Sequence, residues 1–180
     1  MKIGLIVGSL RKESWNKKIA EVVKTLFPAE MTVDFIEIAD LPLYNADFEG
    51  ENELDVYKRV RKDIKAHDAF IFFTPEYNRS FSAAVKNVID IASVAPDGNL
   101  WGGKPVAVMS ASIGSMGGVS GNLALRQTFV NLDMRPMQQP EVYLSKVDTL
   151  FENGELNEKT KAFLEKAVRA FCAHVKKEIA

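Results

Sequence analysis

Short apolar runs alternate along this chain with stretches in which apolar residues recur at the spacing of a helix. The apolar runs predict strands at 2–7, 32–38, 69–73 and 106–110, and a weaker one near 134–138. Runs this short and uniformly apolar are typical of parallel strands covered by helices on both faces. The stretches between and after them show amphipathic helical patterns that include Trp15, Val56, Val85, Leu125 and Phe163. The alternation predicts a doubly wound, three-layer α/β fold with right-handed crossovers.

Composition narrows the classes of function. The 180 residues fit one domain, 1–180, and a content of 47% hydrophobic and 26% charged residues is ordinary for a globular protein in water. A net charge of −1 argues against a basic nucleic-acid surface and against a strongly acidic electron carrier. The single cysteine, Cys172, excludes an intrachain disulfide, and no apolar run has the length of a membrane span or the form of a signal sequence. We therefore expect a cytoplasmic protein that binds neither nucleic acid nor membranes.

The first loop, 8–16, follows the first predicted strand and leads into a helix. Backbone N–H groups at a helix start are unsatisfied, and the helix dipole makes that end partly positive, so this turn can hold an anion. Ser9, Ser14 and Asn16 add neutral hydrogen bonds, and the guanidinium of Arg11 suits a phosphate. A helix start that is merely capped by Ser14 explains the same residues equally well. Neither a three-glycine dinucleotide motif nor a Gly-Lys-Ser/Thr nucleotide loop is present.

The second loop, 74–80, comes directly after the third predicted strand. Pro75 stiffens the strand exit, so the backbone that follows keeps a fixed shape. The amides of Glu76, Tyr77 and Asn78, with the tyrosine ring, offer the mixture of polar and aromatic contacts that a flat polar heterocycle needs. A proline turn whose tyrosine covers the core is an equally good interpretation of this segment alone.

The third loop, 110–118, is rich in glycine and serine. Gly114, Gly117 and Gly118 allow the backbone to approach a ligand closely or to adopt positive φ. Such a turn is weak evidence by itself. However, all three loops follow strands of one parallel sheet, and ligands of such sheets bind beyond the carboxyl ends of the strands. The sequence therefore predicts one shared site.

Together these residues resemble the NADPH-dependent FMN reductase family, and within it the flavodoxin-like quinone, chromate and azo-dye reductases. The resemblance is carried by 8–11 with Ser14 and Asn16, by 75–78 with Lys86, Asn87 and Asp90, and by 114–118, and it covers nearly the whole chain in order. It implies a flavodoxin-like three-layer α/β/α fold with five parallel strands in the order 2-1-3-4-5. One departure is the segment 81–84, where family members often carry Pro-Gly. There we expect Ser82 to cap the next helix, with more effect on the substrate pocket than on flavin binding.

The resemblance also implies a set of FMN-binding residues. By similarity, the phosphate would be bound by Ser9, Arg11, Ser14 and Asn16. The ribityl chain and isoalloxazine would be flanked by Pro75, Glu76, Tyr77 and Asn78, and the ring would be approached from its other side by Ser112, Gly114 and Gly117. No side chain would serve as a catalytic acid, base or nucleophile, because the flavin carries the chemistry. A metal site is not expected, since the two histidines, His67 and His174, lie on predicted helices without partners at ligand spacing.

The implied activity is an FMN-dependent NAD(P)H oxidoreductase. Two electrons would pass by ping-pong hydride transfer from NAD(P)H through FMN to quinones or similar acceptors, which include azo dyes, chromate and free flavin. The family also implies a homodimer or homotetramer, with the helix of Lys86, Asn87 and Asp90 in a structural or interface role. Phe81 and Trp101 would be either exposed apolar contacts beside the site or core residues. The choice between NADPH and NADH stays open.

Two other functions are compatible with the same topology. The first is a flavodoxin-like electron carrier without NAD(P)H activity, against which the near-neutral charge and Arg11 argue. The second is a phosphorylation-receiver domain, which needs clustered acids after the first strand and an aspartate after the third. Those positions hold Gly8-Ser9 and Thr74-Pro75, so we reject it.

Overall fold

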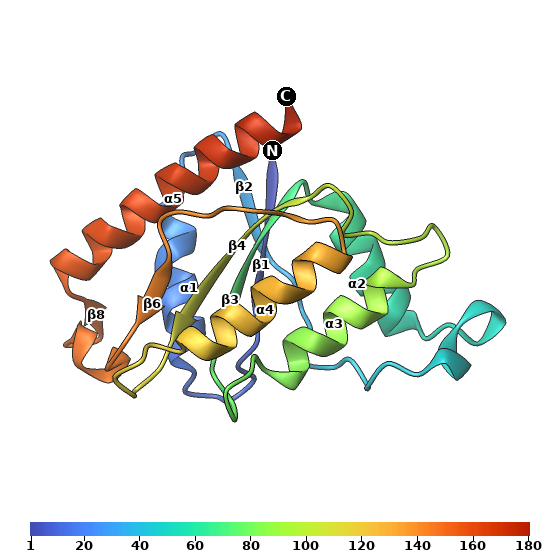
Figure 1. The fold of residues 1–180 in the computed structure, drawn as a ribbon, viewed down its shortest axis with the longest axis horizontal. Coiled ribbons are helices and arrows are strands. Elements are labelled where there is room, and N and C mark those ends of the chain that lie inside the picture. The colour runs from blue at the N-terminus through green and yellow to red at the C-terminus, as the bar shows by residue number, and fades with distance from the viewer.

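The computed structural model describes all residues from Met1 to Ala180. Its parallel sheet consists of β1 (Lys2–Val7), β2 (Thr32–Phe35), β3 (Ala69–Thr74), β4 (Pro105–Ala111), β5 (Arg135–Pro136) and β6 (Val142–Leu144). The strand order is β2-β1-β3-β4-β5, with β6 also paired to β4 (Figure 1). The predicted flavodoxin-like order 2-1-3-4-5 is thereby confirmed.

Five helices cover the two faces of this sheet. They are α1 (Trp15–Thr25), α2 (Asp55–Ala66), α3 (Ala83–Ser93), α4 (Val119–Asn131) and α5 (Glu158–Ile179). Helices α1 and α5 lie on one face and α2, α3 and α4 on the other, which gives the predicted three layers (Figure 1). Short elements complete the chain: three 3-10 turns, η1 (Ala46–Phe48), η2 (Gly50–Asn52) and η3 (Val147–Leu150), and a hairpin of β7 (Phe151–Glu152) and β8 (Glu155–Leu156).

Each face of the sheet has its own apolar core because strand residues point alternately to opposite sides. Leu5 and Val7 of β1 pack with α1 and α5, whereas Ile6 packs with α2, α3 and α4. The second core contains Trp101, which is fully buried against Phe70 and donates its indole N–H to the Ile89 carbonyl at 3.0 Å. Trp101 is therefore a core residue and not an exposed contact beside the site.

Two strand predictions differ from the structure. The second strand ends at Phe35 and not at residue 38. The sequence also missed β6, which continues the sheet beside β4 after β5 has ended. Its three residues are too few to show a period that distinguishes a strand from a loop.

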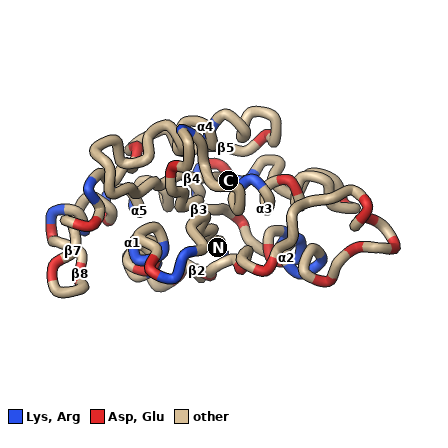
Figure 2. Tube along the Cα trace, turned by 90° about the horizontal axis from the view of Figure 1, so that it is seen from below, with Lys and Arg blue, Asp and Glu red and all other residues tan.

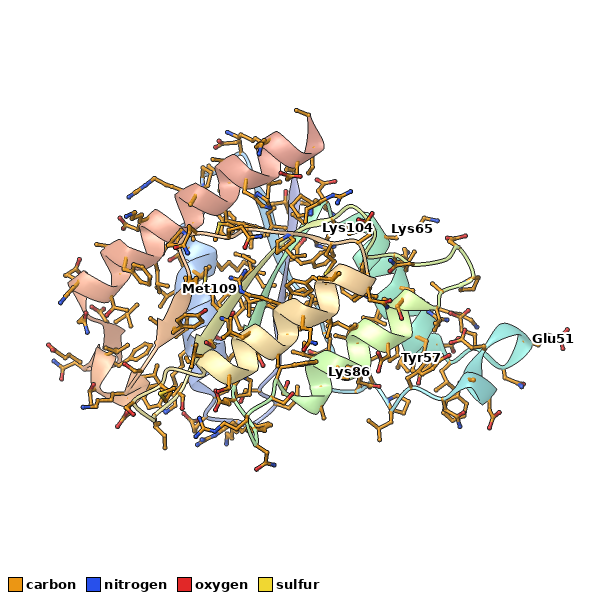
Figure 3. All side chains as sticks on the ribbon, viewed as in Figure 1. Glu51, Tyr57, Lys65, Lys86, Lys104 and Met109 are labelled. Carbon is orange, nitrogen blue, oxygen red and sulfur yellow. The ribbon has the colours of Figure 1, made fainter.

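The carboxyl ends of the three central strands bring the predicted loops to one edge. Val7 pairs with Phe73, and Thr74 pairs with Ser110, so the loops that follow β1, β3 and β4 begin side by side. In Figure 1 these loops lie together at the lower edge of the molecule. Lys104, just before β4, lies at the opposite edge, and Met109 lies on β4 between the helical layers (Figure 3).

None of the helices has the length and apolar character that a membrane span needs.

Candidate functional site

In the loop after β1, the first backbone amide is hydrogen-bonded within the chain, and the amides that follow it are not. The Gly8 amide donates to the Phe73 carbonyl at 2.7 Å, and a Cβ at Gly8 would lie 2.4 Å from the hydroxyl of Ser82, so only glycine fits there. No backbone N–H group from Ser9 to Asn16 donates to an acceptor within the chain. A run of free amides at a helix start is the arrangement that binds phosphate groups.

Two side chains of this loop also shape it. Ser14 caps α1, as in the alternative interpretation of this loop, by accepting a hydrogen bond from the Lys17 amide at 3.1 Å, which leaves its hydroxyl hydrogen free to donate. Asn16 is buried, and its Nδ2 donates to the Ala111 carbonyl at 3.1 Å, which ties α1 to the end of β4. The Oδ1 of Asn16 is buried and has no partner. A buried acceptor without a donor is costly, so this atom indicates a ligand hydroxyl or amide at this position.

The loop after β3 is a tight turn that presents its tyrosine. The backbones of Tyr77 and Ser80 exchange two hydrogen bonds, of 2.9 and 3.0 Å. Asn78 and Arg79, which lie between them, have φ values of 51° and 67°, a backbone conformation that residues other than glycine rarely adopt. Tyr77 is 52% exposed at the tip. It therefore does not cover the core, and its ring is available to a ligand.

The Glu76 side chain has a structural task that the sequence did not reveal. Its Oε2 accepts hydrogen bonds from the amides of Ser120 and Gly121, at 2.9 and 3.2 Å, at the start of α4. The carboxylate thus caps α4 from a distant loop and lies 3.6 Å from the Arg79 guanidinium. No local pattern signals this contact, because the partners are 44 and 45 residues apart.

The loop after β4 is braced by its own hydrogen bonds. The Ser112 hydroxyl accepts from the Gly114 amide at 3.1 Å, and the Ser112 amide donates to the Leu144 carbonyl at 3.0 Å. Gly117 has a φ of 61°, and a Cβ there would lie 2.8 Å from the Tyr143 backbone. The glycine therefore allows the loop to pack closely against β6.

The three loops surround a cavity of about 180 Å³. Of the predicted site residues, those that line it are Ser9, Arg11, Asn16, Pro75, Glu76, Tyr77 and Ser112. Those that belong to the same loops but do not line it are Ser14, Asn78, Gly114 and Gly117. The sequence missed three further lining residues, Trp15, Ala111 and Ile113. Arg11 is exposed and has no carboxylate within 4.0 Å, so the cavity carries an unpaired positive charge.

Other residues singled out from the sequence lie outside the cavity. Asn87 is buried and holds the loop before α2, since its Oδ1 accepts from the Tyr44 amide at 2.7 Å. Lys86 and Asp90 form an exposed ion pair on α3 at 2.6 Å (Lys86 is labelled in Figure 3). Burial raises the pKa of the Cys172 thiol, which lies 3.5 Å from the Met31 sulfur within the core. These three contacts are structural.

The two histidines lie away from the three loops. His67 contacts the Asp63 carbonyl beside the end of α2, and His174 contacts the Arg135 carbonyl from α5. Neither lines the cavity. No group of three or more His, Cys, Asp or Glu side chains is arranged to hold a metal ion.

Comparison with known proteins shows the family to which this chain belongs. A family model described as NADPH-dependent FMN reductase matches residues 1–149. The chain belongs to the NADPH-dependent FMN reductase family. A quinone reductase from Pseudomonas putida is 47% identical over 175 residues, which are 97% of this chain and 94% of that protein.

Solved structures agree with the family. FerB, a flavoenzyme NAD(P)H:(acceptor) oxidoreductase from Paracoccus denitrificans, has a TM-score of 0.91 at 33% identity and covers 98% of both chains. A flavodoxin from Pseudomonas aeruginosa has a TM-score of 0.59 at 19% identity and covers 98% of this chain and 99% of its own, which supports the fold alone. This FMN reductase is therefore an oxidoreductase with FMN as cofactor and NAD(P)H as co-substrate. The free amides of the first loop and the unpartnered Asn16 oxygen fit FMN, which has both a phosphate and a hydroxylated chain.

Proposed function

We propose that the cavity binds FMN through the loops after β1, β3 and β4, and that the enzyme reduces quinone-like acceptors. The free amides from Ser9 to Asn16 carry this proposal. They would hold the phosphate together with Arg11, Ser9 and the free hydroxyl hydrogen of Ser14. The Oδ1 of Asn16 is an acceptor and so is a phosphate oxygen, so we assign this atom to a ribityl hydroxyl.

The second and third loops would position the ring. Backbone amides of Glu76, Tyr77 and Asn78 supply edge hydrogen bonds, and Pro75 fixes their direction. On the other side of the ring would lie the loop of Ser112, Gly114 and Gly117, whose backbone packs against β6. The Glu76 carboxylate keeps the two loops in register through its bonds to α4. Because these groups are fixed before the ligand arrives, little reorganisation is needed on binding.

FMN held there would supply the two-electron redox chemistry between NAD(P)H and the acceptor. The chain itself contributes binding and orientation, since the one carboxylate that lines the cavity, that of Glu76, is engaged in capping α4. Two apolar or aromatic side chains that line the cavity are exposed, Tyr77 at 52% and Ile113 at 68%, and Met116, in the same loop as Ile113, is 55% exposed. They offer a flat aromatic acceptor an apolar surface, and the quinone reductase name of the Pseudomonas putida relative supports a quinone.

Both substrates would use this one opening in turn, which gives ping-pong kinetics. Initial rates measured against NADPH at several fixed quinone concentrations should give parallel double-reciprocal lines. Intersecting lines would show a ternary complex and contradict a shared opening. A flavodoxin-like carrier would show no NADPH-dependent quinone reduction at all.

We also infer that the protein forms homo-oligomers, with a dimer as the simplest unit. Leu123 and Val130 lie on α4 and are 51% and 85% exposed, although a lone helix surface is normally polar. Sedimentation should therefore give about twice the 20.0 kDa chain mass. Replacement of both residues by lysine should yield folded monomers, and an unchanged mass would exclude this face as the interface.

A further inference from the structure

A second cavity, of about 210 Å³, lies on the other side of the phosphate loop. It is formed by the end of β1, the loop after it, the start of α1 and the residues at the end of β2. Ser9 and Arg11 line this cavity as well as the FMN cavity, so a single loop separates the two. A ligand that extends from the flavin across the phosphate loop would reach it.

Positive charge at this cavity is not neutralised within the chain. Arg11 and Lys17 line it, Lys12 is next to Arg11, and none of the three has a carboxylate within 4.0 Å. The neighbouring Lys18, by contrast, pairs with Glu13 at 3.2 Å. Figure 2, which views the molecule from the loop edge, shows a blue stretch between α1 and β2, with a red segment next to it. Such a cluster of unpaired cations beside a cavity attracts an anion.

The walls of the cavity are apolar and include an aromatic ring. Phe35, Ile36 and Leu10 line it, and Leu10 is 53% exposed. Lys17 is a part-buried residue, and its ammonium lies 3.5 Å from the centre of the Phe35 ring. The contact holds the cation over the ring and at the cavity. An apolar surface with a fixed cation matches a flat ring that carries a phosphate.

One carboxylate, that of Glu37, also lines the cavity. Its Oε1 accepts a hydrogen bond from the Ala39 amide at 2.8 Å, which turns that oxygen back toward its own loop. The two lining cations still outnumber it. A carboxylate facing the ribose hydroxyls would instead favour NADH. Glu37 should therefore act against a preference for NADPH.

We propose that this second cavity receives the adenosine 2′-phosphate end of NADPH, and that Lys17 makes the enzyme prefer NADPH to NADH. The inference rests on the proposed function, because the nicotinamide must reach the flavin beside the loops after β3 and β4. The cavity lies beyond the phosphate loop from that position, so the part of the dinucleotide that arrives there is the distal one. The 2′-phosphate is the one group that NADPH has and NADH lacks.

The test compares two cofactors in a charge-removing variant. In Lys17→Gln, the ratio of kcat/KM for NADPH to that for NADH should fall about tenfold, since a charge-assisted contact to the 2′-phosphate is lost. Lys24→Gln is the matched control, because Lys24 lies over the same Phe35 ring at 5.3 Å and on the same helix but does not line the cavity. Its ratio should stay as in the unmodified enzyme. In Glu37→Gln the ratio should rise.

A binding measurement tests recognition of the 2′-phosphate independently of turnover. Calorimetry on the FMN-loaded enzyme should show that adenosine 2′,5′-bisphosphate binds more tightly than 5′-AMP, and Lys17→Gln should remove that difference. An equal loss with both cofactors, an unchanged ratio, or equal binding of the two probes to the unmodified enzyme would overturn the inference. If neither NADPH nor NADH reduces the flavin of the unmodified enzyme, the proposed function fails instead, and the two probes still decide whether the cavity recognises the 2′-phosphate.

Discussion

At the scale of single residues, Asn16 is the side chain through which we propose that the fold contacts FMN. Its Nδ2 ties α1 to the Ala111 carbonyl, whereas its Oδ1 is buried without a partner. We predict that Asn16→Asp raises the Kd for FMN about tenfold or more, because a carboxylate there repels the phosphate and cannot donate to Ala111. Fluorescence titration of the apoprotein with FMN measures this.

Asn122 provides the matched control for that variant. It is also fully buried and donates from Nδ2 to a strand carbonyl, that of Val108 at 3.3 Å, but it does not line the FMN cavity. Asn122→Asp should therefore disturb the fold while leaving the Kd for FMN unchanged. Equal effects of the two variants on the Kd would mean that Asn16 acts through the fold alone.

Tyr143 gives a prediction for alkaline pH. Burial and the neighbouring Glu141 carboxylate raise the pKa of Tyr143 from 10.0 to about 12. Between these values the unfolded chain releases the proton and the folded chain keeps it, so this residue makes stability fall as the pH rises through that window. In Tyr143→Phe the free energy of unfolding, measured by urea denaturation from pH 9 to 11, should decline less steeply. An equal slope in both proteins would contradict this origin.

The sequence predicted residue roles where these depend on near neighbours. Ser82 caps the helix that follows it, as expected, and Ser14 does so as in the alternative interpretation of its loop, because a capping side chain bonds to an amide only three positions on. The role of the Glu76 carboxylate could not be predicted, because its partners lie on another element. The same holds for Asn87, which fixes a loop 43 residues away. Which predicted site residues contact FMN remains a prediction that the binding experiments address.

At the scale of elements, Arg61 on α2 is the clearest anchor. It is 5% exposed, and its Nε and Nη2 donate to the Ile91 carbonyl of α3 at 3.0 and 2.9 Å. The same guanidinium pairs with Glu49 and Glu53, each at 2.6 Å, and so fixes the segment before α2. One buried side chain thus links two helices and the loop that leads into them.

We predict that Arg61→Met lowers the free energy of unfolding by about 3 kcal/mol, because it leaves two carboxylates and a carbonyl without their partner. Urea denaturation measures the loss. The control is Arg59→Met on the same helix, whose exposed pair with Asp40 at 2.6 Å should be worth less than about 1 kcal/mol. Similar losses in the two variants would show that burial of Arg61 does not matter.

Element prediction succeeded where an apolar run was complete. The first strand was predicted with its observed bounds, and β3 and β4 within one residue at each end, since both faces of these strands are buried. The second strand was predicted too long because Ile36 and Ile38 are buried although β2 ends at Phe35, and only the Ile36 amide, which donates to the Leu5 carbonyl at 3.0 Å, still bonds to β1. A hydrophobic sequence pattern predicts that a residue is buried, but it does not predict whether that residue belongs to a strand.

At the scale of the whole molecule, two cavities lie on either side of one phosphate loop at one edge of the sheet. This arrangement follows from the strand order, because β1 stands between β2 and β3 and its loop can face both neighbours. A reductase with this geometry can hold its cofactor on one side and the distal part of its co-substrate on the other.

The central claim is that the loop after β1 binds the phosphate of FMN for use by NAD(P)H. The most direct measurement is the visible absorption spectrum of the purified protein, before and after anaerobic addition of NADPH. We predict a yellow protein whose flavin bands bleach without any partner reductase and return when a quinone is added. A colourless protein that does not bind FMN in a titration would contradict the account.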